Sequence, residues 1–207
     1  MPIIFALDFF DLLKGAGLLA YPLAACSFAM VFIIAERTYA LRTNVVMPQD
    51  LVDAIIENKP YSGGKHSVLA RILDFAEDHE QDADAVKAFA RLEINRMERG
   101  IPYLDIIYAA GPLFGLTGTI WGLLNVFGQI NAETGLPDPV AFTKGVSLAL
   151  SATLFGLGVA IPALLGGGYL QRKVENYAVR IDSLLERINS RRASTRGARE
   201  PAVEVVR

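Results

Sequence analysis

Three long stretches of this chain contain no acidic, basic or histidine side chain, and this absence constrains the fold more than any other feature of the sequence. No Asp, Glu, Lys, Arg or His occurs in residues 15–35, 106–132 or 145–171. At about 1.5 Å of rise per residue, the shortest of these windows forms a helix of roughly 31 Å, which matches a hydrocarbon core of about 30 Å. The sequence therefore predicts an all-α membrane protein with three transmembrane helices.

Composition agrees with a membrane protein and argues against other classes. Hydrophobic residues make up 52% of the chain and charged residues 20%, and the charged residues are concentrated between the three windows. The formal net charge of −2 gives no indication of nucleic-acid binding. Cys26 is the only cysteine, so no disulfide can form within the chain.

The cysteine allows one alternative interpretation of the first window. Residues 23–26 read Leu-Ala-Ala-Cys and resemble the cleavage box of a lipoprotein. However, the apolar run continues past Cys26 to Ala35, and no basic residue precedes Lys14. We therefore expect the first span to be retained.

Basic residues near the ends of the windows predict how the chain is oriented in the bilayer. One end of each window lies next to several arginines or lysines, whereas the opposite ends carry only Lys14 and Lys144. The basic ends contain Arg37, Arg42, Arg91, Arg96, Arg99, Arg172, Lys173, Arg180 and Arg187. Because such residues favour the cytoplasmic side, we expect an outer N-terminus and a cytoplasmic C-terminus.

The windows and the charge pattern divide the chain into eight expected segments. They are an outer interfacial helix (1–14), the first transmembrane helix (15–35), a cytoplasmic helical region (36–105), the second transmembrane helix (106–132), an outer loop (133–144), the third transmembrane helix (145–171), a cytoplasmic stalk (172–190) and a mobile tail (191–207). Asp138 and Pro139 fit the N-cap and first position of the third helix. The tail is either an ordinary disordered terminus or a basic segment that touches anionic lipid.

Helical periodicity outside the windows predicts packed helices at residues 49–58, 66–78 and 84–99. The second of these carries an apolar stripe that must pack against another element, made of Val68, Leu69, Ile72, Leu73 and Phe75. The stalk repeats apolar residues at three- and four-residue spacing, at Val174, Tyr177, Ile181, Leu184 and Ile188. We expect the stalk to be an amphipathic continuation of the third transmembrane helix.

Small residues in the second and third windows predict close contact between those helices. The second window contains two Gly-x-x-x-Gly spacings, a pattern typical of helices that pack closely in membranes. We assign helix packing to Pro112, Gly115, Gly118, Gly122, Gly156 and Pro162. Each glycine weakens its own helix, so this number of glycines indicates a geometric requirement.

Hydroxyl groups in the same two windows are candidates for a polar path through the bilayer. The second window contains Thr117 and Thr119, and the third contains Ser147, Ser151 and Thr153. A serine or threonine in lipid commonly donates to a carbonyl of its own helix. Thr119, Thr153, Ser147 and Ser151 can instead line a narrow path for protons, and the residues alone leave both interpretations open.

The windows lack the kind of group that usually carries protons across a membrane. Proteins that move protons by themselves generally hold a carboxylate or histidine within the bilayer as a relay. Either this chain moves no protons, or a partner supplies the titrating group.

The second and third windows resemble a known family. Residues 110–122 read AGPLFGLTGTIWG, which is similar to the Pro-x-x-Gly-Leu-x-Gly-Thr-Val-Trp-Gly signature of the second helix in ExbB and TolQ. Residues 145–157 and 160–163 are similar to the third helix of that family. The chain thus resembles the ExbB/TolQ/MotA proton-channel family, and ExbB-like proteins most closely. Leu148 departs from the pattern, because ExbB and TolQ commonly carry glutamate there.

The resemblance implies a homopentamer in the bacterial inner membrane, with a periplasmic N-terminus and a pore lined by the second and third helices. A single-span partner of the ExbD or TolR type would bring a proton-binding aspartate into the pore, and a TonB-like protein is a further possible partner. Thr119 and Thr153 match the threonines that the family places beside that aspartate. Hydroxyls can hydrogen-bond either protonation state of a carboxyl group. Proton passage would then drive transport or mechanical work at the cell envelope.

Other functions fit the sequence less well. A flagellar MotA-like subunit is one alternative, but MotA has four spans and this chain has three windows. A self-sufficient channel would need intramembrane charge, and a scaffold without an ion path has little need for threonines at both motif positions. We expect no enzyme, metal site or cofactor, because His66 and His79 are the only histidines and lie in charged segments typical of solvated turns.

Overall fold

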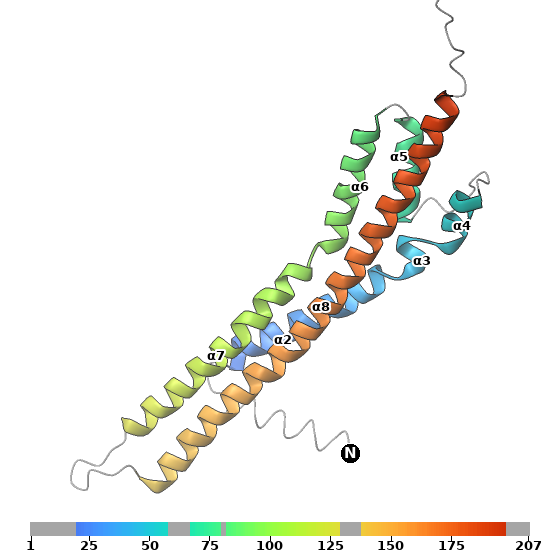
Figure 1. Ribbon diagram of the computed structural model, residues 1–207. Helices are drawn as coiled ribbons and strands as arrows, with labels where there is room; N and C mark the ends of the chain where they lie inside the picture. Colours follow the sequence, from blue (N-terminus) through green and yellow to red (C-terminus); the bar gives the residue numbers. More distant parts are fainter. Residues whose placement is uncertain (1–19, 58–66, 80–81, 129–137, 198–207) are drawn as a thin grey trace, which may run out of the picture. The chain divides into compact units, whose positions relative to one another are not determined.

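The computed structural model of the chain describes residues 20–57, 67–79, 82–128 and 138–197. The elements in these ranges are all helices (Figure 1): α2 (Ala20–Ala40), α3 (Thr43–Val46), α4 (Gln49–Glu57), α5 (Val68–Asp78), α6 (Ala83–Glu98), α7 (Ile101–Phe127) and α8 (Pro139–Gly197). The predicted interfacial helix at residues 1–14 lies outside the described residues. For the described residues, the predicted all-α class is confirmed.

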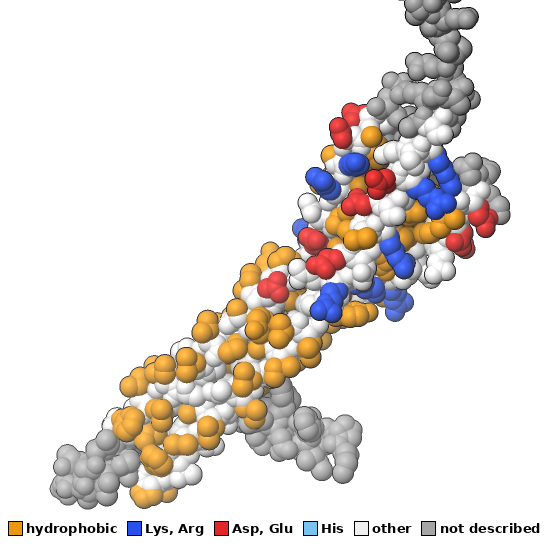
Figure 2. Space-filling model, in the orientation of Figure 1, with side chains coloured by type: hydrophobic (Ala, Val, Ile, Leu, Met, Phe, Trp, Pro, Cys, Tyr) orange, Lys and Arg blue, Asp and Glu red, His pale blue; other side chains and the backbone are white. Residues whose placement is uncertain are grey.

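Within the described ranges, three helical segments are long and apolar enough to cross a membrane. They are α2, the stretch Ala83–Phe127 that comprises α6 and α7, and Pro139–Arg191 within α8. Each segment contains most of one apolar window of the sequence, so the prediction of three such helices is confirmed. Figure 2 shows hydrophobic side chains gathered over α7 and the first part of α8, and charged side chains over α6 and the later part of α8.

Arg99 and Gly100 separate α6 from α7. Gly100 has a φ of 95°, which lies in the left-handed region that favours glycine. Pro102 follows within the first turn of α7, where the N–H that proline lacks would have no helical partner. A Cβ at position 100 would also lie 3.3 Å from Nε of Arg37. Both the backbone and this contact therefore oppose a larger residue at the junction.

The N-terminal end of α8 forms as predicted. The Asp138 carboxylate accepts a hydrogen bond of 3.0 Å from the backbone N–H of Ala141, and Pro139 is the first residue of the helix. The aspartate thereby satisfies one of the N–H groups that a helix start leaves without a partner. From there α8 continues without a break to Gly197, beyond the predicted end of the stalk at residue 190.

The chain folds into two compact units. Unit 1 comprises Met1–Arg37 and Gly100–Leu170, and unit 2 comprises Thr38–Arg99 and Gln171–Arg207. Unit 1 therefore contains most of α2, all of α7 and the first part of α8. Unit 2 contains α3 to α6 and the later part of α8.

Unit 1 buries many of its small residues and leaves many large apolar side chains exposed. Ile34 of α2 lies close to α8, because a Cβ on Gly166 would be 2.5 Å from the Ile34 Cδ1. Phe28, Trp121 and Leu165 are more than half exposed. An outward apolar surface of this kind suits helices that face lipid tails or apolar partner helices.

In unit 2, α5 packs against α6 through the predicted apolar stripe. Val68, Leu69, Ile72 and Leu73 are buried, and the Phe75 ring stacks on that of Phe89 in α6 at a centroid distance of 4.3 Å. The Ser67 hydroxyl caps α5 by accepting from the backbone N–H of Ala70 at 3.1 Å. The prediction that this stripe packs against another element is confirmed.

The later part of α8 holds α3 and α4 in unit 2. Most of the predicted stalk stripe is buried: Val174, Tyr177, Ile181 and Leu184. The Tyr177 hydroxyl donates to the carbonyl of Leu41, just before α3, at 3.2 Å. The Arg191 guanidinium donates to the carbonyls of Ile55 at 2.8 Å and Ile56 at 3.1 Å, at the end of α4. These last carbonyls of α4 would otherwise lack helical donors.

Candidate functional site

In unit 1, α7 and α8 lie side by side and touch through their backbones (Figure 1). A Cβ added to Gly156 of α8 would lie 2.5 Å from the carbonyl oxygen of Gly111 in α7. Nearer the other end of the contact, a Cβ on Gly122 would lie 2.9 Å from the carbonyl oxygen of Gly145. Real Cβ atoms almost never approach within 3.0 Å of other heavy atoms, so a larger residue at Gly156 or Gly122 would push the helices apart.

The other residues assigned to helix packing occupy both buried and outward positions. Gly115 and Gly118 are buried in α7. Pro112 of α7 is half-buried, and Pro162 of α8 is exposed. Since proline has no N–H, each of these prolines leaves the carbonyl four residues earlier without its helical donor. Both helices therefore contain a backbone acceptor in an otherwise apolar segment.

Thr153 lies at the contact between α7 and α8, and Thr119 lies on α7 one turn after Gly115, the residue that Thr153 approaches. Thr153 is half-buried, and its hydroxyl approaches the Gly115 carbonyl oxygen of α7 at 3.5 Å, which makes a long and weak hydrogen bond. Thr119 is half-buried and donates to the Leu116 carbonyl of its own helix at 2.7 Å. Each hydroxyl oxygen keeps lone pairs that can accept from a protonated carboxyl group.

Ser147 and Ser151 line a different surface. Both face an open groove of about 360 Å³ along α8, which is lined by Thr143, Val146, Ser147, Leu150, Ser151 and Leu154. Thr153 is two residues after Ser151, so it projects from another side of the helix. The structure thus brings the two serines together and places the two threonines near each other, but it does not gather all four hydroxyls into one cluster within a single chain.

Charge is scarce along α7 and along the part of α8 that belongs to unit 1. Asp105 is the only charged residue of α7. Among the described residues there is no group of three or more His, Cys, Asp or Glu side chains that could hold a metal ion. The chemistry available between α7 and α8 is therefore hydrogen bonding by hydroxyl and carbonyl groups.

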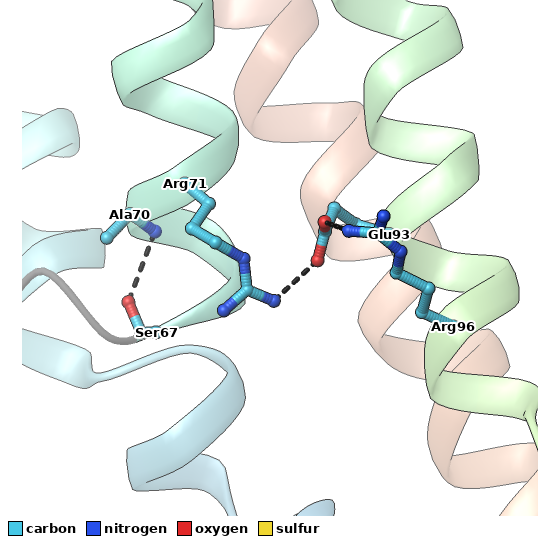
Figure 3. A network of polar contacts seen from close by, with 5 residues as sticks. All are labelled: Ser67, Ala70, Arg71, Glu93 and Arg96. Atoms are coloured by element: carbon cyan, nitrogen blue, oxygen red, sulfur yellow. Dashed lines mark hydrogen bonds and ion pairs between the residues drawn. The ribbon is translucent and has the colours of Figure 1, made fainter.

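Sequence reasoning missed one buried carboxylate, which lies in unit 2 (Figure 3). Glu93 of α6 is only 1% exposed and pairs with Arg71 of α5 at 2.5 Å and with Arg96 at 2.6 Å. The two arginines are considerably exposed, so water solvates part of their charge. A signal was present in the sequence, because Glu93 shares the buried face of α6 with Val86, Ala90 and Met97. A carboxylate at an apolar position of a helix indicates a paired, buried charge.

Comparison with known protein families gives one match, which covers most of the helices described above. Residues 58–183 match the family model described as the MotA/TolQ/ExbB proton channel family. The match covers more than half of the chain and includes α5, α6, α7 and much of α8.

Curated proteins similar to this chain also carry the names ExbB and TolQ. The biopolymer transport protein exbB1 of Vibrio cholerae serotype O1 is 25% identical over 196 residues, which cover 86% of this chain and 86% of that protein. The biopolymer transport protein ExbB of Salmonella typhimurium is 40% identical over 81 residues, or 39% of this chain and 33% of that protein. The Tol-Pal system protein TolQ of Haemophilus influenzae is 35% identical over 83 residues, or 40% of this chain and 36% of that protein.

Proposed function

Because the chain belongs to the MotA/TolQ/ExbB proton channel family, we propose that it is the pore-forming subunit of an inner-membrane motor driven by the proton motive force. The chain is a multi-pass membrane protein and a proton channel component of biopolymer transport systems, and it is not an enzyme. Its relatives include ExbB and TolQ proteins, which favours work at the cell envelope over a flagellar role.

The observation that carries this proposal is that the second and third spans contain hydroxyl groups but no charged side chain. The Thr153 hydroxyl approaches the Gly115 carbonyl of α7, Thr119 lies one turn after Gly115, and residues 106–132 and 145–171 contain no Asp, Glu, Lys, Arg or His. A proton crossing such a region needs a group that titrates. We therefore propose that a single-span partner of the ExbD or TolR type supplies a carboxyl group, to which both threonines can hydrogen-bond in either protonation state.

The distribution of hydroxyls around α8 supports an assembly of several chains. Ser151 faces an open groove while Thr153 faces α7, so one chain by itself does not surround a path. We propose a homopentamer, as the resemblance to ExbB implies, in which grooves and threonines of neighbouring chains enclose the partner helices. A TonB-like protein is the further partner that would transmit the work.

Proton flux into liposomes tests the proposal. The chain reconstituted alone is expected to give the flux of empty liposomes, because its spans lack a relay. Reconstituted with the ExbD-type protein of its own organism, it is expected to conduct protons when a membrane potential is applied. Flux from the chain alone would instead indicate a self-sufficient channel, and absence of flux from the pair would favour a scaffold.

A further inference from the structure

Asp105 lies on the same face of α7 as Thr119, and the proposed function leaves this carboxylate unused. At about 100° of rotation per residue, Asp105 lies roughly 40° around the helix from Thr119, and Pro112 lies roughly 20° from it. The same geometry places the Asp105 carboxylate about 21 Å along the axis from Thr119. Asp105, Pro112 and Thr119 therefore share a face of a helix that carries no other charged residue.

The Asp105 carboxylate also lies next to α8. A Cβ on Gly167 would be 3.8 Å from Oδ1 of Asp105 and 3.3 Å from Cβ of Leu104. Because position 167 has no side chain, the carboxylate is close to the α8 backbone and is nevertheless exposed. Asp105, like Thr119, is part of α7, and its carboxylate lies close to α8, the helix that carries Thr153.

A further acceptor lies between the carboxylate and the threonines. Pro112 has no N–H to give to the carbonyl of Tyr108, the residue four positions earlier. Tyr108 is one turn from Asp105 and is 41% exposed. The Asp105 carboxylate and the Tyr108 carbonyl are thus two hydrogen-bond acceptors one turn apart, whereas most neighbouring side chains of α7 are apolar.

We propose that Asp105 is the proton outlet of the pathway, the group that exchanges protons between water on the inner side and the region of Thr119 and Thr153. This inference rests on the proposed function and on the predicted orientation. In each transfer an O–H bond of a hydrated proton breaks as one forms on the carboxylate. The carboxylate is then regenerated when its proton passes to bulk water.

A structural role for Asp105 has a different signature. A carboxylate near the start of α7 can stabilise the helix through the partial positive charge of its N-terminus. Loss of a structural role would lower the thermal stability and the assembly of the protein. It would leave the proton flux through correctly assembled protein unchanged. Asp84 provides the matched control, because it is an exposed carboxylate in the first turn of α6.

The experiment measures potential-driven proton flux in liposomes that contain the chain and its ExbD-type partner. Asp105→Asn is expected to reduce flux at least tenfold with unchanged native mass and thermal midpoint. Asp105→Glu, which keeps the carboxyl group, should restore most of the flux, and Asp84→Asn should leave it unchanged.

Two results would overturn the assignment of the outlet. The first is wild-type flux in Asp105→Asn. The second is a loss of flux in Asp105→Asn that accompanies an equal loss of assembly, with no rescue by Asp105→Glu. A different result would reject the proposed function itself. If Thr119→Val and wild type both lack flux with the partner present, the pathway and its outlet are both rejected.

Discussion

Three threonines of α7 and α8 show how local surroundings distinguish otherwise similar hydroxyls. Thr117 is exposed and donates to the Leu113 carbonyl of its own helix at 2.8 Å. Thr119 also bonds within its helix but is half-buried, and Thr153 reaches across to α7. The sequence alone placed all three on apolar helices, and only the pairing of the helices shows that Thr153 lies at their contact.

Removal of either contact threonine is expected to stop proton flux without disrupting the protein. Thr119→Val and Thr153→Val keep the side-chain shape but remove the hydroxyl that would bond the partner's carboxyl group. We expect at least a tenfold loss of flux in liposomes that contain the partner, with an unchanged native mass. Thr117→Val is the matched control and should conduct like wild type; full flux in both contact variants would contradict the placement of the path.

At the scale of elements, the sequence predicted the helices better than the breaks between them. Charge-free windows identified the apolar helices, and Asp138 marked the start of α8 because a carboxylate cap depends only on nearby residues. The break at Gly100 was not predicted, since glycine alone does not report a positive φ. The buried position of Glu93 was missed because burial depends on α5, which pairs with it from a distant part of the sequence.

Two neighbouring glycines of α8 give a controlled test of the helix contact. A Cβ on Gly156 would meet the Gly111 carbonyl at 2.5 Å, whereas a Cβ on Gly158 would have no heavy atom within 4 Å. Gly156→Ala is expected to destabilise the protein by about 1–3 kcal/mol, because the helices must separate. Gly158→Ala should be neutral or slightly stabilising, since alanine favours a helix by up to about 1 kcal/mol over glycine.

Thermal unfolding in detergent, followed by circular dichroism, measures both glycine variants. Helix propensity acts equally at the two positions, so any difference between their midpoints reports the contact with α7. Equal midpoints would show that α7 and α8 do not touch through Gly156.

At the scale of the whole molecule, the sequence located the candidate site but did not complete it. The hydroxyls at Thr119 and Thr153 were found from their motif positions, yet the two threonines and the serines of the groove open onto different surfaces of unit 1. The physical reason why one chain does not complete the path is simple. A path through a membrane needs polar groups on all sides, and two apolar helices in contact supply polar groups on one side only. In the proposed function the rest of the path comes from other chains, which no single sequence contains.

The orientation of the whole molecule can be tested with single cysteines, because Cys26 is the only native one. In a Cys26→Ser background, Val140→Cys places a thiol at the exposed start of α8, and Ser190→Cys places one at an exposed position near its other end. Basic residues such as Arg172 and Arg187 should hold the later part of α8 in the cytoplasm. In spheroplasts, a membrane-impermeant maleimide is therefore expected to label the Val140→Cys variant at once and the Ser190→Cys variant only after permeabilisation. The opposite pattern would invert the topology and place Asp105 on the outer side, where it would be an inlet rather than an outlet for protons.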